Sequence, residues 1–317
     1  MTDQSETSDH AAASSTPLRL SSPSARRLPE RSAQAARRVR ARMVELPGGV
    51  FAMGSEDEDV NPGDGEGPVR PVEVAGFRVA TTAVTNAEFD RFVKATGYRT
   101  QAEEFGWSYV FHLFAREVEQ SKIRGSADGT PWWIAVDGAD WRHPDGPRSS
   151  LWNRRDHPVV HVSHADAEAY CAWSGTRLPT ETEWEYAARG GLESKRYAWG
   201  DELTPGGKHM CNIWQGLFPQ VNTAEDGFVG TAPVTSFEPN GYGLYNVAGN
   251  VWEWTSSPWD DEVSSYDTWV VRGGSYLCHA SYCNRYRVAA RTRNTGDSSS
   301  GNTGFRVVAD LDRSETA

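Results

Sequence analysis

The signals for helices restrict the fold most, because all of them lie before residue 191 of a 317-residue chain. Three segments each begin with a Ser or Thr followed three positions later by an acidic residue, and each ends at a glycine. Such a capping box with a glycine C-cap predicts helices of about ten residues over 85–97, 163–175 and 180–190. From Trp199 onward no long helical pattern appears. We therefore expect the second part of the chain to fold as short strands and turns.

Strand-like runs occur on both sides of these helices. Alternating or β-branched residues predict strands in 43–55 and 71–84, and closing strands in 270–276, 286–293 and 303–310. The chain also has 13 Trp among 30 Gly and 17 Pro, which suggests long irregular segments pinned by indole rings. These features predict an α+β class with much irregular backbone.

The N-terminal 41 residues differ in composition from the rest. They are rich in Ser, Ala and Arg with few large apolar residues, and we expect residues 1–41 to be a disordered tail. The arginines between Arg26 and Arg42 favour a solvated arm over a site for an acidic partner. Residues 42–317 show no linker or internal repeat and are expected to form one compact domain.

Charge and hydropathy exclude several classes of protein. The formal net charge of −11 argues against a nucleic-acid-binding surface. No run approaches about 18 apolar residues, so no membrane span is expected. The N-terminus lacks a basic start and an apolar stretch, and no hydrophobic segment follows Arg26-Arg27, so we expect a cytoplasmic protein. Permanent disulfides are then not expected, and a monomer is the default.

Histidines give only a weak signal for a metal site. Pro158 and the valines around His161 predict a strand in the run DHPVVHVSHAD. The pair His164 and Asp166 matches the HxD half of a non-haem iron site, but Asp166 already serves the predicted helix start. Structural histidines are therefore the preferred interpretation.

The strongest candidate for chemistry is the run RGGSYLCHASYCNRYR, which holds Cys278 and Cys283. Two residues five apart share no face of a strand or helix, so their thiols converge only if the backbone bends. Gly273 and Gly274 make such a bend plausible.

Several interpretations of this pair stay open. A reducible disulfide and two packed core cysteines are two of them, and zinc lacks a full set of four ligands even if His279 contributes. Two converging thiolates suit Cu(I), and Arg285 and Arg287 would favour the deprotonated sulfur that a metal requires. Cys171 and Cys211 are interpreted as packing residues.

Turn-rich runs also offer oxygen ligands. The run CNIWQG with AEDGF, and the run YNVAGNVWEW, combine Asn, Asp and Glu side chains with exposed carbonyls. Calcium prefers such oxygens, but neither run is an EF-hand loop, and polar turns explain them equally well.

The longer motifs resemble a known family. These are RLPTETEWEYAARGG, NIWQGLFPQVNTAEDGF, GTAPVTSFEPNGYGLYNVAGNVWEWTSS and RGGSYLCHASYCNRYRVAARTRNTGDSSSGNTGFRVV. In register over about residues 43–310, they resemble the formylglycine-generating enzymes, or sulfatase-modifying factors. The RLPTE–EWE and GN-WEW segments mark only the wider superfamily, whereas SYLCHASYCNRYR is specific to the catalytic branch. A non-catalytic lectin-like module that binds peptide or glycan is therefore the alternative.

The resemblance implies a compact C-type-lectin-like/sulfatase-modifying-factor fold. It implies that O₂ oxidises a cysteine, in a Cys-x-Pro-x-Arg motif of an unfolded sulfatase, to Cα-formylglycine. Cys278 and Cys283 match the family's copper pair, Ser275 and Tyr282 match residues lining that site, and Asn302 matches a position near the cleft. The resemblance assigns structural calcium to two sets of residues, Asn212, Ile213, Asp226 and Phe228, and Asn246, Gly249, Val251 and Glu253.

Departures from the family pattern concern disulfides. Val288, Ala188 and Val307 stand where extracytoplasmic members carry cysteines. Cys171 matches one half of a bridge whose other half is Val307, so the resemblance implies a free thiol at Cys171, which agrees with the cytoplasmic expectation.

Overall fold

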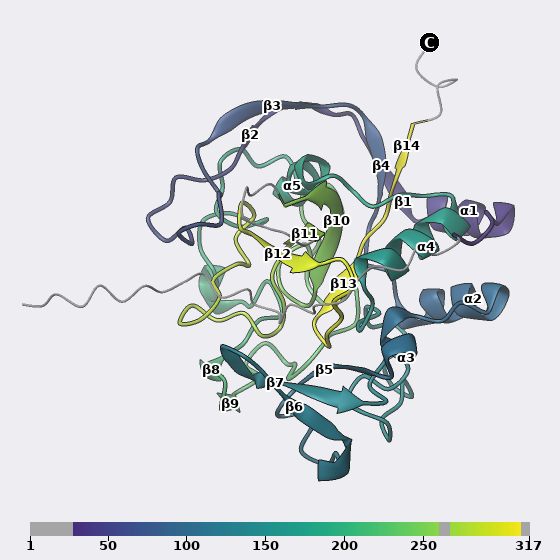
Figure 1. Cartoon of the computed structure of the whole chain (residues 1–317). Coiled ribbons are helices and arrows are strands. Elements are labelled where there is room, and N and C mark those ends of the chain that lie inside the picture. Colours follow the sequence, from purple (N-terminus) through teal and green to yellow (C-terminus); the bar gives the residue numbers. More distant parts are fainter. Residues whose placement is uncertain (1–27, 260–266, 312–317) are drawn as a thin grey trace, which may run out of the picture.

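The computed structural model describes residues 28–259 and 267–311 (Figure 1). Within these ranges the chain combines short helices with several small sheets, which confirms the α+β class. The α-helices are α1 (Ala33–Arg40), α2 (Asn86–Thr96), α3 (Gln101–Phe105), α4 (His164–Ser174) and α5 (Glu181–Arg189), with 3₁₀ turns at Gln120–Lys122 and Pro205–Gly207. None of these helices is long and apolar enough to cross a membrane.

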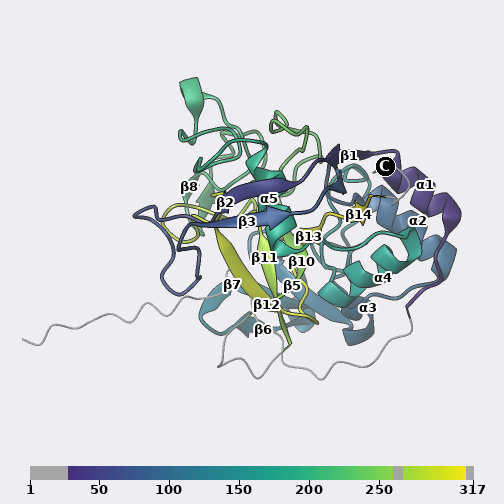
Figure 2. The same ribbon diagram turned by 90° about the horizontal axis from the view of Figure 1, so that it is seen from above.

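The strands form separate sheets rather than one continuous sheet. Their orders are β1 (Met43–Leu46)–β4 (Phe77–Ala80)–β14 (Val308–Asp310), β12 (Arg291–Thr295)–β11 (Thr268–Arg272)–β10 (Trp252–Pro258)–β13 (Thr303–Phe305), β2 (Gly49–Met53)–β3 (Arg70–Val74), β5 (Trp107–Phe111)–β7 (Thr130–Asp137)–β6 (Ile123–Ala127), and β8 (Gly216–Leu217)–β9 (Val221–Asn222). Neighbouring strands are antiparallel except β10 and β13, which are parallel. Helices α1, α2 and α4 gather on one side of the molecule in both views (Figures 1 and 2).

The three predicted helices are confirmed with their caps. Helices α2, α4 and α5 each begin at a complete capping box and end at a glycine with left-handed backbone. The structure adds α3, which uses a fourth capping box between Thr100 and Glu103. It ends at Gly106 after five residues, so it is too short for the apolar periodicity that marks longer helices.

The prediction of a disordered tail over residues 1–41 is wrong for its last part. Ser32 caps α1, and Ala35, Ala36 and Val39 are buried. The Ser32 amide also donates to the Trp173 carbonyl, 2.7 Å away, at the end of α4. Small apolar residues on one face of an Arg-rich helix were sufficient for docking, although the composition resembled that of a disordered arm. Residues 1–27 lie outside the described residues.

The strand predictions are partly confirmed. Segment 43–55 forms β1 and β2, and segment 71–84 contributes to β3 and β4. The strand predicted around 158–162 is wrong, because the chain there makes only an isolated bridge and His161 has a left-handed φ of 57°. The valines of this run are buried in the core, which accounts for the strand-like pattern. Its backbone forms hydrogen bonds with loops rather than with a neighbouring strand, as from the Val159 amide to the Val84 carbonyl. In segment 286–293 regular strand begins only at Arg291.

Buried indoles pin the irregular segments, as predicted. Trp141 and Trp214 are about 1% exposed, although both lie outside helices and strands. The indole N–H of Trp254, on the central strand β10, donates to the Val162 carbonyl at 3.0 Å. These rings belong to a core that also contains Cys278 and Cys283, except for Trp214, which packs in a neighbouring cluster.

A buried ion pair connects the β12–β11–β10–β13 sheet to the adjacent β1–β4–β14 sheet. The guanidinium of Arg306 binds the carboxylate of Glu253 on β10, and both side chains are about 2% exposed. The same guanidinium donates to the carbonyls of Ala80 and Tyr245. The Arg306 side chain thus joins three segments that share no ladder of backbone hydrogen bonds.

We predict that Arg306→Met lowers the free energy of unfolding by about 3–5 kcal/mol, because it leaves the Glu253 carboxylate buried without its cation. The control is Arg124→Gln, which breaks an exposed ion pair with Asp137 and should cost less than about 1 kcal/mol. Denaturant unfolding of both variants measures the difference, and equal losses would contradict the assigned role of Arg306.

Candidate active site

The cysteine segment begins with a sharp change of direction after β11. Gly273 and Gly274 have φ values of 93° and 72°, which favour glycine. A Cβ on Gly274 would lie 2.8 Å from the Arg285 carbonyl oxygen, so the returning chain leaves no room for a side chain. Residues 275–283 then run through turns, in which the Cys283 amide donates to the His279 carbonyl at 2.7 Å.

This bent backbone brings the two sulfurs together. Cys278 Sγ and Cys283 Sγ are 2.8 Å apart, and both residues are 1% exposed. The four cysteines are free thiols, so the pair is not a disulfide and Cys171 is unpaired as expected. The Ser275 amide donates to Cys278 Sγ at 3.3 Å, and Arg285 Nη1 lies 3.9 Å from Cys283 Sγ. The arrangement places two soft donor atoms at one point.

The two thiols have different acidities. Burial raises the pKa of Cys278 well above its ordinary value, and the neighbouring Cys283 raises it further. Burial also opposes ionisation of Cys283, but the hydrogen bond from Cys278 and the charge of Arg285 outweigh it and lower the pKa of Cys283 to about 7. The contact between the two sulfurs and the charge of Arg285 therefore favour a single negative charge on the pair.

Ser275 and Asn302 lie together beside this pair. Asn302 Nδ2 donates to Ser275 Oγ at 3.0 Å, and Ser300 Oγ donates to Asn302 Oδ1 at 2.8 Å. All three residues are fully buried. The chain of hydrogen bonds fixes the Ser275 hydroxyl next to the amide that contacts Cys278.

Tyr282 forms an aromatic group with two residues from other segments. Its ring stacks on Phe218 with centroids 4.6 Å apart, and it meets the Trp132 ring edge-on at 4.8 Å. Its hydroxyl is buried and has no hydrogen-bond partner among the described residues, although the Trp132 side chain lies beside it. Burial raises the pKa of Tyr282, so the hydroxyl stays protonated and can donate to a ligand.

The other candidate metal ligands have structural roles. His164 stacks on Trp269 at 3.9 Å, and burial lowers its pKa to about 3, while Asp166 accepts from the Ser163 and Gln101 amides. Burial raises the pKa of both Cys171 and Cys211. Among the described residues, no group of three or more His, Cys, Asp or Glu side chains is arranged to hold a metal. Within that part of the chain, the cysteine pair thus offers a metal two sulfur ligands and no third His, Cys, Asp or Glu.

Three of the four ligands expected in the first calcium set lie together, namely Ile213, Asp226 and Phe228. Asp226 accepts from the amides of Ile213 and Phe228, at 3.0 and 2.9 Å. The side-chain amide of Gln215 donates to both the Ile213 carbonyl and the Asp226 carboxylate, so an N–H donor stands where a cation would meet these oxygens. Asn212 Oδ1 is buried without a partner in the described part of the chain. This donor set fits a hard cation that displaces the Gln215 amide.

The second set does not fit a cation. Both oxygens of the Glu253 carboxylate accept from Arg306, and Oε2 also accepts from the Trp184 indole at 2.7 Å. The charge of Glu253 is thus already compensated by a guanidinium. The remaining side chain, Asn246, has a buried Oδ1 without a partner in the described ranges, which alone is a weak site.

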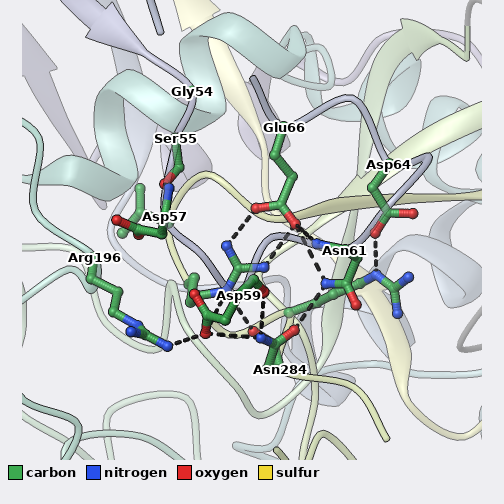
Figure 3. Close-up of polar contacts among 12 residues, drawn as sticks. Gly54, Ser55, Asp57, Asp59, Asn61, Asp64, Glu66, Arg196 and Asn284 are labelled. Atoms are coloured by element: carbon green, nitrogen blue, oxygen red, sulfur yellow. Dashed lines mark hydrogen bonds and ion pairs between the residues drawn. The ribbon is translucent and has the colours of Figure 1, made fainter. Parts of the chain in front are cut away.

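The sequence analysis missed the segment that contacts the chain directly after Cys283. We call residues 54–66 the acidic strap (Figure 3). The carboxylates of Asp64 and Glu66 bind Arg285 and Arg287, just after Cys283 in the sequence. The signal was present as an acidic run, EDEDVNPGDGEGP, and an arginine-rich run, NRYRVAARTR. Opposite charges alone did not show that the two runs meet.

Comparison with known proteins identifies the family. A family model described as "Sulfatase-modifying factor enzyme 1-like domain" matches residues 29–311. The chain belongs to the sulfatase-modifying factor family. The formylglycine-generating enzyme of Streptomyces coelicolor is 60% identical over 281 residues, which cover 85% of this chain and 89% of that protein.

The sulfatase-modifying factor family also includes a relative named as inactive. "Inactive C-alpha-formylglycine-generating enzyme 2" of Bos taurus is 47% identical over 274 residues, covering 86% of this chain and 89% of that protein. The solved structure of PvdO from Pseudomonas aeruginosa has a TM-score of 0.61 at 24% identity, covering 85% of this chain and 94% of that one, and shows the fold. Since family membership includes an inactive relative, the cysteine site has to carry the argument for catalysis.

We predict that the reduced, metal-free protein gains one thiolate per chain as the pH rises through about 7, because Cys283 ionises before the other thiols. Arg285→Met should move this step to higher pH, because it removes the positive charge beside the sulfur. Ultraviolet thiolate absorbance measures both steps. Cys211→Ala is the control and should leave the titration unchanged; a titration near the ordinary thiol value of about 8.5 in the parent protein would refute the assignment.

Proposed function

We propose that this protein oxidises a cysteine in a Cys-x-Pro-x-Arg motif of an unfolded sulfatase to Cα-formylglycine, with O₂ as the oxidant. The observation that carries the proposal is the contact of two buried thiols, 2.8 Å apart, within the segment SYLCHASYCNRYR. The 60% identity to a protein named formylglycine-generating enzyme supports the same reaction. Together they favour an enzyme over a binding module.

Copper is the cofactor that the donor set supports. Cys278 and Cys283 offer two soft sulfurs, and within residues 28–259 and 267–311 no carboxylate or imidazole is arranged to complete a zinc site, which suits Cu(I). Cu(I) bound there would supply the one-electron chemistry that allows O₂ to oxidise a thiol-bearing carbon. The guanidinium of Arg285, 3.9 Å from Cys283 Sγ, favours the deprotonated sulfur that binds metal.

The protein's own residues would orient the reactants. Ser275, fixed by Asn302, offers its hydroxyl next to Cys278, and Tyr282 offers a protonated hydroxyl that has no partner in the described structure. Burial of the pair excludes water, which strengthens electrostatic contacts within the site. A substrate thiol reaches the sulfurs only when neighbouring side chains move, and we propose that the partly exposed aromatic group of Trp132, Phe218 and Tyr282 makes this opening.

Calcium is proposed at the first set of oxygens only. There a cation would replace the Gln215 amide between Ile213 and Asp226, and would compensate a carboxylate whose pKa burial raises. The bound ion would hold a loop that has little regular hydrogen bonding. We further propose that the protein works as a monomer in the cytoplasm, a setting that suits the free thiol of Cys171.

The test of the reaction uses reduced, Cu(I)-loaded protein and a Cys-x-Pro-x-Arg peptide in air. We expect mass spectrometry to show that the peptide cysteine loses sulfur and two hydrogens and gains one oxygen. Cys278→Ser and Cys283→Ser should abolish both this product and binding of one Cu(I) per chain, because each removes one of the two sulfurs. Cys211→Ser is the matched control, a buried thiol outside the pair, and should keep both.

Two outcomes would overturn the proposal. Peptide binding without product, unchanged in the Cys278→Ser and Cys283→Ser variants, would indicate the non-catalytic binding module. Full turnover in a metal-free preparation would indicate dithiol chemistry without copper.

We predict that a strong calcium chelator lowers the melting temperature more than it changes Cu(I) affinity, because the proposed calcium supports a loop rather than the cysteine pair. Asp226→Asn should remove this sensitivity, since it removes the carboxylate of the site. Thermal unfolding with and without chelator measures the effect, and identical melting of the parent protein under both conditions would refute the calcium site.

A further inference from the structure

The acidic strap contacts the residues that follow Cys283, and Figure 3 shows its contacts with Asn284. Its first residue is anchored to α5, where the Gly54 amide donates to Glu185 at 2.8 Å and the Gly54 carbonyl accepts from Arg189 at 2.9 Å. The strap thereby joins a rigid helix to the cysteine loop, although the two runs are more than 200 positions apart in sequence.

Two contacts of the strap fix the backbone on either side of Arg285. The Asn284 side chain donates to the Asp59 carbonyl at 2.8 Å and accepts from Asn61 at 2.9 Å. Glu66 binds Arg287 through both oxygens, at 2.5 and 2.7 Å, with both side chains buried. These contacts shape the loop but do not reach a sulfur.

The third contact does reach a sulfur through one intermediate. Asp64 Oδ2 accepts from Arg285 Nε at 2.5 Å, and Arg285 Nη1 lies 3.9 Å from Cys283 Sγ. Asp64 and Arg285 are each 4% exposed and Cys283 is 1% exposed. The carboxylate occupies the Nε edge of the guanidinium, so a different edge is presented to the sulfur.

A buried guanidinium has a direct electrostatic consequence for a metal at the thiol pair. Two thiolates and one cuprous ion carry a net negative charge, and a buried charge is costly unless an opposite charge accompanies it. Arg285 supplies that charge, and Asp64 determines where the guanidinium points. We propose that Asp64 is a positioning residue for the copper site, which holds Arg285 against Cys283 and thereby raises the affinity of the cysteine pair for Cu(I). This inference rests on the proposed copper-dependent function.

The test compares two variants that each break a buried pair within the same strap. Asp64→Asn releases Arg285, which faces the sulfur, and Glu66→Gln releases Arg287, which does not. Cu(I) affinity is measured by competition with a chromophoric Cu(I) chelator, and thermal unfolding reports the stability loss of each variant. We expect Asp64→Asn to weaken Cu(I) binding about ten- to a hundredfold, as losses around metal ligands commonly do. Glu66→Gln should weaken it less, because it loosens the loop without releasing Arg285 from Asp64.

Further variants separate positioning from general damage. Arg285→Lys keeps the positive charge but loses the forked guanidinium that contacts Asp64 and the sulfur at the same time, so it should also weaken Cu(I) binding. This variant provides the test if Asp64→Asn does not fold. In the double variant Asp64→Asn, Arg285→Lys, the two losses should not add, because both act through the same contact.

The outcomes distinguish this inference from the function beneath it. If the parent protein binds no Cu(I) and makes no aldehyde, the proposed function fails and takes the inference with it. If the parent binds Cu(I) and oxidises the peptide, but Asp64→Asn and Arg285→Lys bind Cu(I) as tightly as the parent or no more weakly than Glu66→Gln, the positioning role is overturned and the function stands.

Discussion

Buried arginines, each compensated by carboxylates from a distant segment, are the interaction on which this structure depends. Arg272, Arg287 and Arg306 are among the largest fully buried side chains in the described structure, and each binds at least one buried glutamate. Irregular backbone leaves carbonyls without ladder partners, and a guanidinium can satisfy several of them at once while its charge is neutralised. Loops that would otherwise expose their backbone to water can therefore pack in the interior.

The cysteine site is a product of the same construction. Gly273 and Gly274 turn the chain, but the position of the returning arm is set by ion pairs to the acidic strap. The pairing of Arg285 with Asp64 leaves a guanidinium edge near Cys283. After the hydrogen bond from Cys278, the charge of this same guanidinium lowers the pKa of the Cys283 thiol. Structural and chemical roles share one group of side chains here, which explains why charges are buried beside the proposed metal ligands.

Sequence patterns predicted local structure well and long-range pairing poorly. The capping boxes located α2, α4 and α5, because a cap and its N3 partner are three residues apart and need no other contact. Helix α1 was missed, since its stability comes from docking Val39 and two alanines rather than from its composition. Glu253 was expected to bind calcium, and its actual partner, Arg306, lies 53 positions away.

The sequence by itself determined the class of fold, the three capped helices and the family, because caps and motif spacing act between near neighbours in the chain. Only the tertiary structure decided which carboxylate meets which arginine, and hence that a guanidinium lies beside Cys283. Asp64 and Arg285 are 221 positions apart, and several acidic and basic residues of equal charge were available to each. Charge complementarity limits the kind of partner, whereas packing of the whole chain selects the particular one.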